Sequence, residues 1–238
     1  MPPRLIVAID GPAGSGKSAA ARELAKRLGI PYIDTGAMYR AVALAALRQG
    51  VSFPLDAQAE IEVVKLAQAL ELRFEVAPWG TRVIWAGEDV SEALRVPEVS
   101  RAASQVSAIS GVRRVMVARQ RELGQRAGGV LEGRDIGTVV FPEAAVKVFL
   151  TARPEVRARR RFDELCKLGL EVRWEDVVAE QRERDARDAS RADSPLRPAS
   201  GAIILDTSDL TLAEVVQKLY ELALSAPVTL DRAAPAHL

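Results

Sequence analysis

Residues 11–18, Gly-Pro-Ala-Gly-Ser-Gly-Lys-Ser, match the spacing G-x-x-x-x-G-K-[ST] at every fixed position. Glycines at these places let several backbone N–H groups converge on phosphate oxygens. Lys17 can then reach the β- and γ-phosphates of a nucleoside triphosphate, and the Ser18 hydroxyl can hold Mg²⁺. The segment therefore predicts a triphosphate-binding loop (P-loop) without saying what the triphosphate is for. The residues expected to contact it are Gly11, Pro12, Ala13, Gly14, Ser15, Gly16, Lys17, Ser18 and Ala19.

The elements on either side of this loop suit it. The apolar run 5–9 predicts a strand buried on both faces, and the pattern over 16–29 predicts a helix. A helix that begins at the loop adds free N–H donors and a favourable dipole for anions. This strand–loop–helix context argues against a chance match.

The rest of the chain alternates short apolar runs with helical patterns. Five buried strands separated by helices predict a parallel sheet with helices on both faces, an α/β fold. In the helix at 59–71 we expect Ile61, Val64 and Ala67 to share one face. The further strands are expected at about 31–34, 129–132, 146–150 and 202–206, and the further helices at 37–49, 59–71, 97–107, 111–126, 154–168, 174–190 and 211–225.

Residues 72–92 depart from the α/β pattern. Residues 72–76 alternate strictly between apolar and polar, and turn residues at 78–80 and 87–89 separate the runs that follow. Such a pattern predicts a small antiparallel meander inserted into the fold.

Composition excludes several classes of protein. Hydrophobic residues make up 48% of the 238, charged residues 27%, and the net charge is +1, so nothing points to nucleic acid or anionic membrane. No apolar run approaches the about 20 residues of a membrane span. The single cysteine, Cys166, cannot form an internal disulfide and fits a reducing cytoplasm, where we expect the protein. We expect Cys166 to be an inert packing thiol and His237, in a loosely ordered tail, to have no role.

Three segments could bind a second, anionic substrate opposite the γ-phosphate. Residues 34–40 join a strand to a helix, and residues 132–138 follow a strand at the edge where open α/β sheets bind ligands. Residues 182–191 place Arg184, Arg187, Asp188 and Arg191 on one helical face. Arginines that close over both substrates would stabilise the transferring phosphoryl group and exclude water.

Each segment also has a purely structural explanation. Residues 34–40 could be a helix start with Thr35 as N-cap, and residues 132–138 an ordinary strand-to-loop turn. The charged run 182–191 could be a solvated, salt-bridged face, and so could the arginines at 153–161. The residues alone leave these alternatives open.

Taken together, the segments resemble the bacterial cytidylate kinase family. The resemblance runs from about residue 4 to about residue 222, and its combination of motifs is far more specific than any one of them. The chain lacks the D-G-[FY]-P-R of adenylate kinases and the D-R-[YH] of thymidylate kinases. The similar stretches are I-D-G-P-A-G-S-G-K-S (9–18), D-T-G-A-M-Y-R (34–40), A-S-Q-V (103–106), G-R-D-I-G-T-V-V-F-P (133–142) and E-R-D-A-R-D-x-x-R (183–191).

The resemblance implies an enzyme that transfers the γ-phosphate of ATP to CMP or dCMP with Mg²⁺, in pyrimidine nucleotide metabolism. It implies small-molecule substrates and one domain over 1–238 with a short helical lid. We expect a monomer, although the sequence does not give the oligomeric state. The expected parts are a core at about 1–36, 128–152 and 200–225, a monophosphate-binding part with the insertion at 37–127, the lid at 153–195 and a tail at 226–238.

The resemblance also implies roles for individual side chains. Ser104, Arg113 and Asp135 would read the base, and Thr35 and Tyr39 would line the monophosphate pocket. The sugar hydroxyls would bind Asp188. The acceptor phosphate would be held by Arg40, Arg134, Arg184 and Arg191, and the catalytic groups would be Lys17, Arg134, Arg157 and Arg184.

Two other functions stay open at this point. One is another P-loop kinase of a nucleoside monophosphate or small metabolite. The other is a regulatory or nucleic-acid-associated P-loop NTPase, although the chain has neither the N-K-x-D of GTPases nor an L-S-G-G-Q-like stretch. A regulatory NTPase would turn over ATP without an acceptor, whereas a kinase would hydrolyse it slowly alone.

Overall fold

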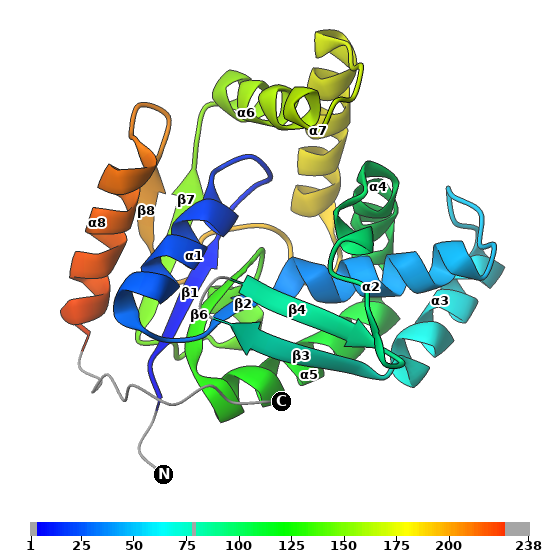
Figure 1. Cartoon of the computed structure of the whole chain (residues 1–238), viewed down its shortest axis with the longest axis horizontal. Coiled ribbons are helices and arrows are strands. Elements are labelled where there is room, and N and C mark those ends of the chain that lie inside the picture. The colour runs from blue at the N-terminus through cyan, green and yellow to red at the C-terminus, as the bar shows by residue number, and fades with distance from the viewer. Residues whose placement is uncertain (1–3, 78–79, 227–238) are drawn as a thin grey trace.

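The computed structural model describes residues 4–77 and 80–226. The predicted turn at 78–80 lies mostly outside the described residues, as do the tail after residue 226 and His237. A five-stranded parallel sheet in the order β2-β6-β1-β7-β8 forms the centre (Figure 1), which confirms the predicted α/β fold. Its strands are β1 (Ile6–Asp10), β2 (Tyr32–Asp34), β6 (Gly129–Gly133), β7 (Val146–Thr151) and β8 (Ile203–Asp206).

Helices cover both faces of the sheet because the side chains of each strand point alternately to opposite faces. In β1, Val7 and Ile9 pack with α1 (Lys17–Leu28) and α8 (Leu212–Leu224). Ala8, between them in sequence, belongs to the larger cluster on the other face. The helices of that cluster are α2 (Thr35–Arg48), α3 (Ala57–Ala69), α4 (Pro97–Val106) and α5 (Ser110–Ala127).

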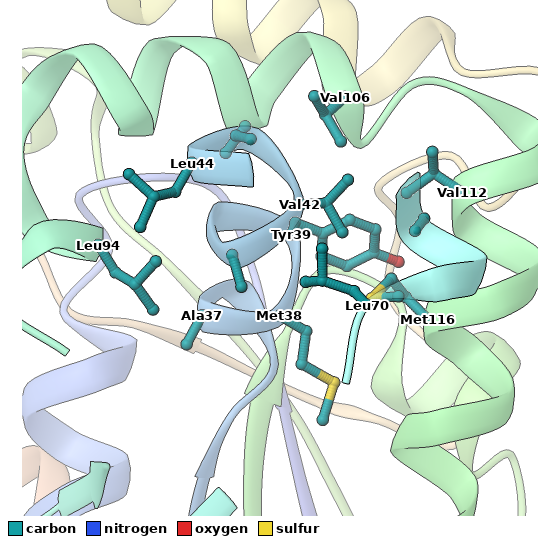
Figure 2. Close-up of a cluster of buried hydrophobic side chains, with 14 of the residues drawn as sticks. Ala37, Met38, Tyr39, Val42, Leu44, Leu70, Leu94, Val106, Val112 and Met116 are labelled. Carbon is teal, nitrogen blue, oxygen red and sulfur yellow. The ribbon is translucent and has the colours of Figure 1, made fainter. Parts of the chain in front are cut away.

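The larger cluster surrounds α2. Figure 2 shows Met38, Tyr39 and Val42 of α2 beside Val112 and Met116 of α5. All five side chains are buried, and Val42, Val112 and Met116 are completely so. Helix α2 is therefore fixed on several sides, which holds its first turn in a constant position at the edge of the sheet.

The predicted insertion is present as a second sheet. It has three antiparallel strands in the order β3-β4-β5, namely β3 (Leu72–Ala77), β4 (Gly80–Trp85) and β5 (Glu88–Asp89). The Thr81 hydroxyl donates to the carbonyl oxygen of Tyr32 at 2.6 Å, which ties this sheet to β2. A short 3₁₀ helix, η1 (Ala93–Arg95), follows the insertion and was not predicted.

Two helices, α6 (Pro154–Lys167) and α7 (Trp174–Ser190), stand beyond the carboxyl ends of the strands. Figure 1 shows them above the loop that joins β1 to α1. A five-residue π-helical segment, η2 (Ile136–Val140), follows β6 on the same edge. No helix in the described part of the chain is long and apolar enough to cross a membrane.

Two helices differ from the sequence-based expectations, since each begins two residues earlier than expected. Helix α2 begins at Thr35, and its N-cap is Asp34, whose carboxylate accepts from the Ala37 amide at 3.1 Å. Thr35 is therefore not the cap. Helix α3 begins two residues earlier than expected and buries Val63 and Ala67, whereas Ile61 is 52% exposed.

Two expectations about burial also fail. Cys166, expected to pack inside, is exposed on α6. Strand β8 lies at the edge of the sheet, and its Ile203 and Ile204 are 46% and 62% exposed, so the sheet is not fully covered there. An edge strand has a neighbour on one side only, and its apolar composition alone cannot reveal this.

Candidate active site

The loop between β1 and α1 depends on its glycines. Gly11 has φ 146°, and a Cβ there would lie 1.9 Å from the carbonyl oxygen of Leu150. Gly16, which caps α1, has φ 86°. Both conformations are unfavourable for residues with a side chain. The backbone therefore runs close under β7 and turns directly into α1, as a phosphate cradle requires.

Lys17 lies in this cradle as a buried cation. Its ammonium group donates to the carbonyl oxygen of Pro12 at 2.7 Å, and the residue is 5% exposed. Burial, and after it the nearby charge of Arg134, lower the pKa of Lys17 to about 7. Because its surroundings disfavour the charged form, the Lys17 ammonium group would be stabilised by a phosphate that binds beside it.

A cavity of about 750 Å³ opens beside the cradle. Its wall carries eleven Lys or Arg residues against six Asp or Glu residues, so it favours a polyanion. The sequence-predicted residues on its wall are Ala13, Gly14, Gly16, Lys17, Ser18, Ala19, Thr35, Tyr39, Arg40, Arg113, Arg134, Asp135, Arg184, Asp188 and Arg191.

One end of the cavity carries hydrogen-bonding side chains that could bind the polar edge of a ligand. Arg113 of α5 and Asp135 form an ion pair in which each side chain is only 4% exposed. Arg113 also donates to the carbonyl oxygen of Ser107 at 2.9 Å, and its guanidinium lies 5.5 Å from the Tyr39 ring. Donor and acceptor groups are thus fixed side by side on the wall, which suits hydrogen bonding to a base.

Asp188 of α7 organises the arginines. It accepts from Arg134 Nε at 3.0 Å and pairs with Arg191. Burial alone would raise the pKa of Asp188, but the charges of Arg134, Arg191 and Arg184 outweigh it and lower the pKa. The carboxylate therefore stays ionised and holds two guanidinium groups beside the cavity.

Arg184 and Arg40 complete the basic wall in different ways. Arg184 Nε is buried with no hydrogen-bond partner among the described residues. Burial lowers the pKa of Arg184 to about 10, with a further contribution from Arg134. Arg40 is paired with Asp34 at 2.6 Å. Among the four arginines predicted to hold the acceptor phosphate, Arg184 is thus the one without a carboxylate partner in the described part of the chain.

Comparison with known proteins identifies the family. A family model described as cytidylate kinase matches residues 7–225. The chain belongs to the cytidylate kinase family. A cytidylate kinase of Solibacter usitatus is 51% identical over 93% of each chain, and one of Mycobacterium avium is 50% identical over 92% of this chain and 94% of its own. A bifunctional pantoate ligase/cytidylate kinase of Synechococcus is 49% identical over 98% of this chain and 43% of its own.

Solved structures support the fold alone. An uncharacterised protein from Eubacterium ventriosum matches with a TM-score of 0.50 at 12% identity, over 93% of this chain and 99% of its own. The family model and the curated relatives confirm the sequence resemblance to cytidylate kinases at the level of the family.

In this member of the cytidylate kinase family, five predicted residues lie off the cavity wall, two of them outside the P-loop. Ser104 is buried, and its hydroxyl accepts from Arg187 at 2.7 Å. Arg157 bonds to the carbonyl oxygen of Ala13 at 3.2 Å and pairs with Asp185 at 2.8 Å, so it links α6 to the P-loop and to α7. Gly11, Pro12 and Ser15 also lie behind the wall, as backbone of the cradle.

Several groups that line this site lie in the predicted segments 132–138 and 153–161 but had no individual role in the sequence predictions. Glu132, at the carboxyl end of β6, is buried, lines the cavity and accepts from the Tyr32 hydroxyl at 2.8 Å. Its place directly before Gly133-Arg134-Asp135 was the available signal. Of the arginines on α6, Arg160 and Arg161 line the cavity, and Arg157 does not. Nothing in the basic cluster at 153–161 distinguishes these residues by type.

Proposed function

We propose that the protein transfers the γ-phosphate of ATP to CMP or dCMP, giving CDP or dCDP. The observation that carries the proposal is a single cavity that joins the P-loop to the Arg113–Asp135 pair, with arginines between them. Membership of the cytidylate kinase family supports the same reaction. Residues of one chain supply both the P-loop and the Arg113–Asp135 end of this cavity, and we propose the monomer as the active unit.

On the donor side, the P-loop amides and Lys17 bind the phosphates of ATP. Ser18, with its hydroxyl, and Glu132, with its carboxylate, both line this cavity. Oxygen donors of this kind fit Mg²⁺, which takes few protein ligands and completes its shell with phosphates and water. Bound there, Mg²⁺ would neutralise charge on the β- and γ-phosphates.

On the acceptor side, the base is read at its hydrogen-bonding edge. Cytosine presents an N4 amino donor beside the N3 and O2 acceptors, and uracil replaces that donor with an acceptor. Asp135 accepts from the amino group, and Arg113 donates to N3 or O2. Because Ser104 is held by Arg187 behind the wall, we assign recognition of the base to Arg113 and Asp135. Asp188 would meet the sugar hydroxyls.

Between the two ends, a phosphate oxygen of CMP attacks the γ-phosphorus in line while the bond from that phosphorus to the β,γ-bridging oxygen breaks, so that ADP leaves. No general base is needed because the acceptor phosphate is already ionised at neutral pH. Arg40, Arg134, Arg184 and Arg191 hold that phosphate and offset the charge that develops during transfer. Helices α6 and α7 act as a lid, and Arg157 couples their closure to the P-loop through the carbonyl oxygen of Ala13.

Replacement of Asp135 tests this reading of the base. Asp135→Ala removes a partner that only cytosine can use, so the CMP/UMP ratio of kcat/KM should fall at least about tenfold, or about 1.4 kcal/mol. Ala192→Ser, at an exposed position after α7, serves as a surface control. Equal losses for CMP and UMP would assign Asp135 to structure or phosphate positioning instead.

A further inference from the structure

Asp135 occupies the N-cap position of η2 but does not cap it. Aspartate is favoured at this position because its carboxylate accepts from the first free amides of the helix. Asp34 and Asp56 do so at the starts of α2 and α3. The Asp135 carboxylate instead pairs with Arg113 at the cavity wall. Another group must therefore satisfy the amides at the start of η2.

That group is Asp10, the last residue of β1. Its two carboxylate oxygens accept from the amides of Ile136 and Gly137 at 2.8 Å and 2.7 Å. Asp10 is 3% exposed, and the strand that carries it neighbours β6, which leads into η2. Both amides are thus used before the Asp135 side chain could reach them.

Asp10 remains a good acceptor at neutral pH. Burial raises the pKa of Asp10 to about 6, against the opposing effect of the two backbone amides. At pH 7 the carboxylate is mostly ionised and both of its oxygens accept. No contact with the nucleotide is needed for this role, since Asp10 does not line the cavity.

We propose that Asp10 is a positioning residue for base recognition: it caps η2 from the neighbouring strand and so frees the Asp135 carboxylate to face Arg113 and the base. The inference rests on the proposed function, because it deepens the role of Asp135 there. Asp10 in this role would also connect the base-binding end of the cavity to the P-loop, because the next residue, Gly11, is the first of that loop.

Asp10→Asn tests the proposal with little change of shape. An amide has one acceptor oxygen, and its NH₂ group would face the second backbone N–H. Asp135 is then drawn back to cap its own helix. We expect the CMP/UMP ratio of kcat/KM to fall about fivefold or more, the size of one lost hydrogen bond. The KM for CMP should rise more than the KM for ATP.

Controls separate positioning from loss of stability. Both acceptors are measured on one preparation, so a partly unfolded sample cannot change their ratio. Val216→Ala, in the core on the face of the sheet covered by α1 and α8, should lower the melting temperature and leave the ratio unchanged. Asp10→Ser, which also keeps one acceptor, should shift the ratio in the same direction. Added to Asp135→Ala, Asp10→Asn should cause no further fall.

A wild-type ratio in Asp10→Asn and Asp10→Ser, beside a lowered ratio in Asp135→Ala, would overturn this inference and leave the proposed function intact. A wild-type ratio in Asp135→Ala itself would reject the assignment of base reading and this inference with it. A further fall in the double variant would show that Asp10 acts by a route other than Asp135.

Discussion

Removal of Asp188 should destabilise the protein because it leaves two arginines without their shared partner. The Asp188 side chain is 1% exposed, and those of Arg191 and Arg134 are 4% and 20% exposed. Breaking a buried ion pair costs about 3–5 kcal/mol, and the partial exposure of Arg134 favours the lower end. At about 2–4 °C per kcal/mol for a chain of this size, Asp188→Ala should melt about 6–12 °C below wild type.

The effect of Asp188→Ala on stability should depend on pH. The pKa of Asp188 is lowered from its ordinary value of 3.8, so its contribution to stability is present above that value. It is lost as the pH falls through the pKa of the folded state. The difference in melting temperature should therefore be full at pH 7 and shrink below about pH 4.

Thermal unfolding followed by circular dichroism measures both effects. Asp193→Ala, an exposed aspartate just after α7, is the matched control and should melt like wild type. We also expect kcat/KM for CMP to fall more than about tenfold, because Arg134 and Arg191 lose their orientation. An Asp188→Ala protein that melts within 2 °C of wild type at pH 7 would refute the view that this carboxylate holds the arginines.

Two further variants test the charge of the site. Lys17→Met should lower kcat/KM by about 10²-fold or more, since its charge serves the transition state; activity within a few-fold of wild type would remove Lys17 from catalysis. Because the pKa of Lys17 is lowered to about 7, the unfolded state binds more protons between about pH 7 and 10, and wild-type stability rises with pH in that window. The ligand-free Lys17→Met protein should therefore melt above wild type, most clearly below pH 7, and a lower melting temperature there would contradict the assigned cost of burying the ammonium group. Arg184→Met should reduce turnover without lowering the melting temperature, because burial beside Arg134 already disfavours that charge. A variant with normal kinetics and only a shifted melting temperature would make Arg184 a structural residue.

Local patterns predicted the fold well because each buried strand and each amphipathic helix carries its own signal. The run 5–9 and the alternation over 72–76 became β1 and β3 almost residue for residue. The predictions that failed concern residues whose exposure depends on which other elements pack beside them. The exposure of Ile61 depends on which face of α3 meets α5, and the exposure of Ile204 depends on β8 having no strand beyond it.

The candidate site divides in the same way. The P-loop is continuous in sequence, so its residues could be named directly, and fifteen predicted residues do line one cavity. The contacts between distant segments could not be predicted. Arg187 donates a hydrogen bond to the Ser104 hydroxyl, Asp188 pairs with two arginines, and Asp10 caps η2. The sequence around each of these residues does not indicate its partner. These contacts depend on how the elements pack.

The proposed function of this protein is to phosphorylate a cytosine nucleotide bound in this cavity. The most direct test incubates the wild-type protein with ATP and Mg²⁺ and, in turn, with CMP, dCMP, UMP, AMP, GMP or no acceptor, and follows formation of ADP. We expect rapid ADP formation with CMP and dCMP, far less with the others, and slow hydrolysis without an acceptor. Failure to phosphorylate both CMP and dCMP, or equally fast ATP turnover with no acceptor present, would contradict it.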